Sequence, residues 1–587
     1  MSQFNPNTTF YNASLPDPYR YAIGALKLNH PALLTAPSSM PVDRFSQQMA
    51  SPITPSGLDT ILPAEPSVGF QPLNPAQIVR LMRHPKRTGE WFNYLRIGND
   101  PSTLRERLAM MATIHQKLDK TGKIQLENLL KNGILTNTDG DDTHSTLYYL
   151  YAIATTKRAE GLSGKNTLQE VVATLDNPYR ISQKFNRLMP DTAQKMLMAE
   201  AQSPRIDPRK PVSADNFATY SNTCQAASIM FVMAQTQPKE LARMAYGLTS
   251  PRLATREKVR LDQLADTPLE AFQRLKKAGI AYKVTGPNEV TVALKLPQTA
   301  YQRMVDDAKL PDKRNGVDAA LQSAFVNLVS RNTYDGLSDR SWDTDSALVT
   351  IENTDSLPPL AKEQLKAIIN AGMPMQATQR QALNLIQQLP MIDPHDRQAL
   401  IDGLFLEASG INEDQISLAR SILQDKGNVE SVTYMASGAI ANSNNSSPYL
   451  FGYNRDFDRI SQDLLTALNA GHYPIIGTVP TDSSGAILNG HITTITGAFV
   501  DKTGALQFVI ADSDDDINHH VIRAARELIP QIHHVSFPKE QAKQILKEMQ
   551  TLGNHYLTPG PAEASRYQVI SMAPPAAPTD STVTRTA

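Results

Sequence analysis

Residues 221–234 of the 587-residue chain read SNTCQAASIMFVMA, a polar start followed by an unbroken run of small and apolar residues. Ser221 and Asn222 are good N-cap residues, and neither proline nor glycine interrupts the run, so the pattern predicts a helix that begins near Cys224. Backbone N–H groups in a first helical turn stabilise a thiolate and lower the pKa of a cysteine. The stretch therefore offers a nucleophile, although a lone cysteine before an apolar helix is more often a core residue.

The composition describes a globular chain with balanced charge. Lysine and arginine number 57 against 58 aspartate and glutamate residues, so no electrostatic argument favours a nucleic acid or an anionic membrane as partner. No run of about 18 apolar residues predicts a membrane span. Cys224 is the only cysteine, which excludes an internal disulfide and suits a reducing compartment. The N-terminus has no secretory signal pattern, and we therefore expect a soluble cytoplasmic protein.

Residues 1–72 are rich in proline, serine, threonine and asparagine. Such a segment buries too little apolar surface to offset its ordering entropy, so we expect a disordered leader. An alternative interpretation is an export signal that is not cleaved, of the kind carried by bacterial effectors that are injected into host cells. Composition by itself does not separate the two interpretations.

Residues 73–203 are predicted to form a helical domain, in which Thr103 begins a capping box (TLRE). Within this domain, residues 137–142 (NTDGDD) begin like a calcium-binding loop. The sixth position is Asp142 rather than glycine, however, and the twelfth is Tyr148 rather than glutamate. We therefore interpret the segment as a polar turn.

The rest of the chain is predicted to hold a catalytic domain in two parts. Residues 204–211 carry three prolines and no periodicity, which is typical of a linker, and a hairpin follows with strands at 281–284 and 289–292. Four helices between 361 and 425 carry no reactive cluster and are expected to form an insertion, and residues 436–448 are expected to form an exposed loop. The predicted boundaries are 204–357 for the first catalytic part, 358–430 for the insertion, 431–575 for the second catalytic part and 576–587 for a disordered tail.

The residues that carry chemistry lie in a predicted hairpin near the C-terminus. Residues 491–500 are β-branched and strand-like, 501–504 form a tight turn, and 506–510 are the partner strand. Because antiparallel strands joined by a tight turn share an end, His491 and Asp512 are expected to lie together. The carboxylate would accept a hydrogen bond from one imidazole nitrogen, and the other nitrogen would take the proton of a thiol.

A cysteine that starts a helix, a Gly-His pair that starts a strand and an aspartate after the next strand occur here in that order. The arrangement resembles the papain-like cysteine enzymes, in particular their bacteriocin-processing peptidase and transglutaminase-like branches. The matching stretches are 222–227 (NTCQAA), 490–497 (GHITTITG) and 509–513 (VIADS), and a strand at 474–479 falls where the family has one. The resemblance covers about 204–300 and 446–575.

The resemblance implies an α+β fold with a papain-like core, in which the cysteine helix packs on a small antiparallel sheet. It implies a Cys224–His491–Asp512 triad that transfers an acyl group from a protein or peptide substrate, without a cofactor or a metal. With water as acceptor the reaction is proteolysis or deamidation, and with an amine it is transglutamination. The N-terminal helical domain and the helical insertion lie outside the resemblance.

Two features depart from the family pattern or compete with it. Papain-like peptidases carry an oxyanion-hole glutamine five or six residues before the cysteine, where this chain has Thr219 and Ala218. Asn222 is then the candidate oxyanion-hole donor, with Asn216 as the alternative. Asp514 is a rival to Asp512 as the residue that orients the histidine.

Other histidines and the helical half of the chain allow a second hypothesis. The pairs His519-His520 and His533-His534 lack a cysteine at metal-ligand spacing, so we interpret them as non-ligands and predict no metal site. About half of the chain is predicted to be helical without any reactive cluster. The second hypothesis is therefore a non-catalytic protein-interaction effector in which Cys224 only fills the core.

Overall fold

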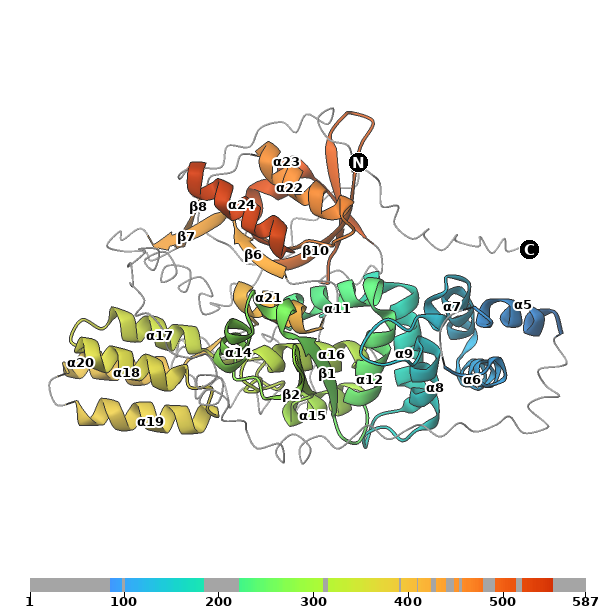
Figure 1. The fold of residues 1–587 in the computed structure, drawn as a ribbon, viewed down its shortest axis with the longest axis horizontal. Coiled ribbons are helices and arrows are strands. Elements are labelled where there is room, and N and C mark those ends of the chain that lie inside the picture. The colour runs from blue at the N-terminus through green and yellow to red at the C-terminus, as the bar shows by residue number, and fades with distance from the viewer. Residues whose placement is uncertain are drawn as a thin grey trace.

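The computed structural model shows a mixed α+β architecture (Figure 1). The predicted leader, the linker at 204–211 and the tail at 576–587 lie outside the residues that it describes. Within those residues, no helix has the length and apolar character needed to cross a bilayer. The described residues are 85–97, 101–183, 221–309, 315–389, 392–408, 410–423, 429–439, 448–452, 457–478, 491–513 and 520–552.

The described N-terminal part is helical, as its periodicity predicts. The capping box at Thr103 is present, with Glu106 Oε2 accepting from the Thr103 backbone N–H at 2.7 Å. The central helix α8 (Thr146–Thr155) is buried along nearly its whole length and packs against its neighbours on several sides. These neighbours include α6 (Leu104–Lys117) and α9 (Gly164–Asp176), while α5 (Pro85–Leu95) packs on α6, and α7 (Lys120–Lys131) packs on α9.

The segment 137–142 is a polar turn that binds protein groups. Asp141 Oδ2 accepts from the backbone N–H of Lys258 at 2.6 Å. Asp142 Oδ1 lies 3.0 Å from Nζ of the buried Lys239, which belongs to α12 (Pro238–Leu248). The carboxylates that suggested a calcium loop therefore fasten this turn to the next layer of the protein.

The middle of the chain surrounds α11 (Cys224–Thr236), which begins at the predicted cysteine. α11 packs against α12 and α16 (Gly316–Val329). The predicted hairpin is confirmed as β2 (Tyr282–Gly286) and β3 (Glu289–Lys295). A further strand, β1 (Ala254–Arg260), pairs with β3, although its sequence ATREKVR carries too many charges to be recognised as a strand. The remaining helices are α13 (Leu261–Leu264), α14 (Pro268–Lys277) and α15 (Gln298–Asp307).

A separate group of helices, the α17–α20 block, projects from one end of the molecule (Figure 1). Its chain enters and leaves side by side, because β4 (Ser341–Trp342) pairs with β5 (Glu407–Ala408). The predicted fourth helix, α21 (Glu413–Leu423), is not part of this block, because its apolar side chains pack into the core around α11. The members of the block are α17 (Thr344–Asn353), α18 (Pro359–Ile369), α19 (Met375–Gln388) and α20 (Pro394–Leu404).

The described C-terminal part contains a six-stranded antiparallel sheet in the order β12-β11-β10-β9-β13-β6. Helices α22 (Phe457–Asn469) and α24 (Lys539–Leu552) cover one face, and α11 and α21 lie against the other (Figure 1). The strands are β6 (Val429–Thr433), β9 (Ile475–Thr478), β10 (His491–Val500), β11 (Leu506–Ala511), β12 (Val521–Ala524) and β13 (Ile532–Pro538).

The sequence predicted β9, β10 and β11 and missed the strands that pair outside them. The prediction of an exposed loop at 436–448 is wrong for its described ends, because β7 (Met435–Ala439) pairs with β8 (Pro448–Gly452). The sequence of β7, MASGA, has none of the β-branched or aromatic residues that mark strands. Its pairing comes from tertiary structure and not from local preference.

Candidate active site

Cys224 is the first residue of α11, and among the described residues no side chain caps the N-terminus of this helix. The N-cap is Thr223, not Ser221 or Asn222, and its hydroxyl donates to Gln322 Oε1 at 2.7 Å and not to the helix. The Ser221 hydroxyl donates to the Gln183 carbonyl at 2.9 Å. The first N–H groups of α11 therefore keep their partial positive charge next to the sulfur.

His491 and Asp512 meet where β10 begins and β11 ends, at one end of these two strands, as the hairpin geometry predicts. His491 begins β10, Asp512 follows the last residue of β11, and His491 Nε2 lies 2.7 Å from Asp512 Oδ1. The two side chains are 21% and 11% exposed, so solvent reaches the pair. In the neutral tautomer that this hydrogen bond favours, Nε2 carries the proton and Nδ1 is the basic nitrogen.

Hydrogen bonds tie the start of α11 to the same edge of the sheet. The Ser228 hydroxyl donates to the carbonyl of Ile492, the residue after His491, at 3.4 Å. The Gln183 N–H donates to the carbonyl of Ser513, the residue after Asp512, at 3.1 Å, and the Gln183 carbonyl accepts from the Ser221 N–H at 2.9 Å. Cys224 lies one turn, about 6 Å along the axis, before Ser228.

The sulfur of Cys224 and the imidazole of His491 are not hydrogen-bonded to each other. Cys224 is 8% exposed, and among the described residues its sulfur makes no hydrogen bond. Ile492 and Ala511 belong to the apolar core that contains α11, and Asp512 lines the same small pocket as Ala227 and Ser228 of that helix.

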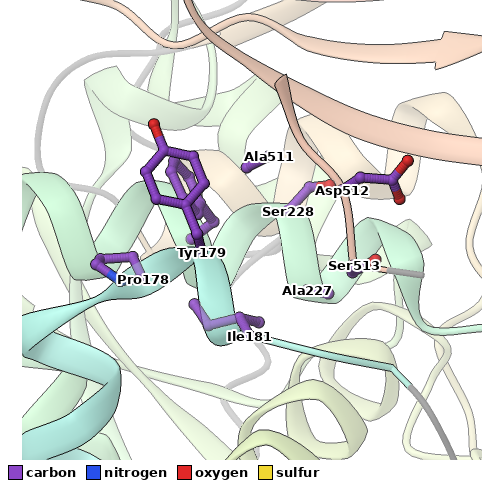
Figure 2. A pocket seen from close by; sticks show the side chains of 9 residues that line it. Pro178, Tyr179, Ile181, Ala227, Ser228, Ala511, Asp512 and Ser513 are labelled. Atoms are coloured by element: carbon purple, nitrogen blue, oxygen red, sulfur yellow. The ribbon is translucent and has the colours of Figure 1, made fainter. Parts of the chain in front are cut away.

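A small pocket lies between α11 and the end of β11 (Figure 2). The Tyr179 hydroxyl donates to Thr496 Oγ1 at 3.1 Å, and burial raises the pKa of Tyr179, so the phenol stays protonated. In Figure 2 the carboxylate of Asp512 points away from the Tyr179 ring. The pocket is lined by Pro178, Tyr179, Ile181, Ala227, Ser228, Phe231, Ala511, Asp512 and Ser513.

The competing residues named from the sequence are only partly described. The Asn222 backbone N–H donates to Asp339 Oδ2 at 2.5 Å, so only the side-chain amide of Asn222 could act as an oxyanion-hole donor. Asn216, Asp514 and His519 lie outside the described residues. The His520 ring makes an edge contact with Tyr179, with the ring centres 5.7 Å apart.

The chain matches no protein-family model, no curated protein and no solved structure. A functional assignment therefore rests on the residues described above. Of the three residues predicted to act together, two are hydrogen-bonded, and the third begins a helix that is tied to the same sheet edge.

Proposed function

We propose that the chain is a thiol enzyme that transfers acyl groups from amides of proteins or peptides. Cys224 is the nucleophile, His491 carries the proton, and Asp512 orients the imidazole. The observation that carries the proposal is the hydrogen bond between His491 Nε2 and Asp512 Oδ1 at the sheet edge where α11 begins.

In the proposed reaction, the imidazole of His491 first accepts a proton and later donates it. Nδ1 of His491 takes the thiol proton, and the thiolate of Cys224 attacks the carbonyl carbon of the amide. The N–H groups of the first turn of α11 stabilise the oxyanion. The imidazolium then donates its proton to the leaving amine, the C–N bond breaks, and a thioester remains. Water or a second amine attacks the thioester, which restores the thiol.

Thiol labelling tests the proposal directly, because Cys224 is the only cysteine and every labelled site is this one. We expect an alkylating probe at pH 7 to modify the wild-type protein quickly and His491→Ala slowly. An ordinary thiol is only about 3% thiolate at pH 7, so the loss of the paired base lowers the rate about thirtyfold. Asp512→Asn should give a smaller decrease, since it changes only the orientation and the tautomer of the imidazole.

His520→Ala is the matched control, because it removes an imidazole near the same pocket without touching the His491–Asp512 pair. Its labelling rate should equal that of the wild type. Equal rates in the wild type and His491→Ala, with circular dichroism showing both folded, would rule out the triad.

A structural role for Cys224 is the second candidate, and its burial favours it. The sulfur lies in the apolar core with α11 and makes no hydrogen bond to any described residue. In that case Cys224→Ser buries an unsatisfied hydroxyl and lowers the free energy of unfolding by about 1–3 kcal/mol. A nucleophile at a site edge predicts nearly unchanged stability for the same variant, so urea unfolding separates the two candidates.

A further inference from the structure

A second group of reactive side chains lies between α21 and β13, apart from the residues proposed for catalysis. Glu413 is the first residue of α21, and His533 and His534 follow each other on β13. A register shift in the pairing of β13 with β9 falls between Ile532 and His534. Successive residues of a regular strand point to opposite faces, and this irregularity allows both imidazoles to turn toward Glu413.

The three ligand atoms of this group form a nearly equilateral triangle. Nδ1 of His533 lies 3.2 Å from Nδ1 of His534, and Glu413 Oε1 lies 3.4 Å and 3.3 Å from these two nitrogens. The two distances to the carboxylate exceed the usual 2.7–3.2 Å of an N–H···O hydrogen bond. With an ionised carboxylate, only the two Nδ1 atoms can carry protons, so hydrogen bonds can account for at most two sides of the triangle.

A metal ion at the centre would satisfy all three atoms together. Metal–ligand bonds of about 2.1 Å place adjacent ligand atoms about 3.4 Å apart in a tetrahedron and about 3.0 Å apart in an octahedron. The observed separations of 3.2, 3.4 and 3.3 Å lie between these values, closer on average to the tetrahedral one. Two imidazoles and one carboxylate are a ligand set typical of zinc and of other divalent first-row metals.

The packing holds the site and leaves one side accessible. The side chains of His533 and His534 are 5% and 8% exposed, whereas that of Glu413 is 34% exposed, so an ion and a water ligand could enter along Glu413. Gly477 of β9 makes room for the His534 ring, because a Cβ there would lie 2.1 Å from its Cε1. Among the described residues, Nε2 of His534 has no hydrogen-bond partner, so the polar contacts of the ring are on the Nδ1 side.

We propose that Glu413, His533 and His534 bind one divalent transition-metal ion, for which Zn²⁺ is the probe, with a water molecule as the fourth ligand. The ion fastens the start of α21 to the sheet. The histidine pair has no cysteine at metal-ligand spacing, and for that reason the sequence predicted that it was not a ligand. The third ligand comes instead from a carboxylate 120 residues earlier in the chain.

Two other groups of potential ligands in the described residues differ from this site. Asp141, Glu240 and Glu257 each form an ion pair with Arg243, and Lys239 adds a second cation 2.9 Å from Glu240, so side-chain cations already occupy this group. Asp393, His395 and Asp396 lie together at the surface, where the side chain of His395 is 92% exposed. The surface group is a control for weak binding to exposed side chains.

The experiment is a calorimetric titration of the metal-stripped full-length protein with Zn²⁺, supported by the visible absorption of bound Co²⁺. We expect the wild type to bind one equivalent at this site, and His534→Ala and Glu413→Gln to weaken that binding more than about tenfold. The cobalt band of the wild type should indicate tetrahedral coordination and should disappear in both variants.

His395→Ala and Cys224→Ser are the matched controls and should bind as the wild type does, which also separates this site from the proposed thiol chemistry. The proposal is overturned if the wild type shows no saturable binding, or if binding persists in folded Glu413→Gln. Loss of binding in His395→Ala or Cys224→Ser would overturn it as well. Glu413→Gln decides the matter if His534→Ala does not fold, because Gln keeps the shape of a partly exposed side chain.

Discussion

The hydrophobic core of the α17–α20 block differs in composition from the core around α11, the part of the molecule that we call the body. The buried apolar side chains of the block are all alanine, isoleucine or leucine, and they come from one continuous stretch of about 60 residues. The core around α11 draws on segments from Trp91 to Ala511. It also encloses charged groups, since Arg243, Glu240 and Glu257 are each 3% exposed. The block is thus held by local apolar contacts, and the body by distant segments and buried ion pairs.

This difference explains where chemistry is found. Within the described residues of the block, the group formed by Asp393, His395 and Asp396 lies at its surface. Around the six-stranded sheet, distant segments meet and bring buried and partly buried polar groups together, as at Glu413, His533 and His534. A core built from neighbouring helices can form without buried polar groups. Where distant segments pack together, hydrogen bonds between buried polar groups help to select one relative position of the segments.

The largest expected effect is the loss of a buried charge from the body. Arg243 Nε lies 2.6 Å from Glu240 Oε2, and Nη2 lies 2.7 Å from Glu257 Oε1. Burial raises the pKa of Glu257 even with Arg243 beside it, so Arg243→Met leaves the buried Glu257 carboxylate without its paired cation. We expect a loss of about 3–5 kcal/mol in the free energy of unfolding, measured by urea denaturation.

Arg260→Met is the control for Arg243→Met, because Arg260 pairs with Asp262 at the surface, where the two side chains are 64% and 47% exposed. It should cost less than about 1 kcal/mol. Similar losses in the two arginine variants would show that the body does not depend on buried charge.

The next effect concerns the block. Leu365 is fully buried in its core, and Leu365→Ala should destabilise the block by about 2–5 kcal/mol. Amide hydrogen exchange should then accelerate in α18–α20 while α11 keeps its protection. Leu360→Ala on the same helix removes a side chain that is 71% exposed and should change little. Faster exchange in α11 would mean that the block and the body unfold together.

A smaller effect is expected where the N-terminal helices meet the sheet. Tyr179→Phe removes the buried hydrogen bond from its hydroxyl to Thr496 Oγ1. Thr496 still donates to the Val509 carbonyl at 3.2 Å, so the loss should be about 1 kcal/mol. Differential scanning calorimetry measures it, and a loss as large as that for Arg243→Met would assign Tyr179 a greater role than one hydrogen bond.

The smallest effect concerns the turn of the β10–β11 hairpin and depends on pH. Hydrogen bonds from the hydroxyl and backbone N–H of Thr503 and from the Ala505 N–H lower the pKa of Asp501 to about 2. The stability that this carboxylate contributes is present above pH 4 and is lost as the pH falls through 2. Asp501→Asn should therefore reduce the wild-type melting temperature slightly at pH 5 and leave a smaller difference at pH 2.

The local sequence determined the elements whose contacts are close in the chain. Thr103 and the apolar period behind it predicted α6, and the uninterrupted apolar run predicted that α11 begins at Cys224. The turn at 501–504 joins two strands directly, so their common end predicted the contact of His491 with Asp512. In each case one short segment contains both the sequence pattern and the residues that make the predicted contact.

Only the tertiary structure decided how these elements face one another. Which face of β10 meets α11, and therefore which side chains lie nearest to Cys224, depends on the packing of the whole core. The meeting of Glu413 with His533 and His534 likewise depends on how α21 lies on the sheet, because the helix and the strand are separate segments of the chain. Segments so far apart are brought together by the burial of the entire core, which no single stretch of sequence specifies.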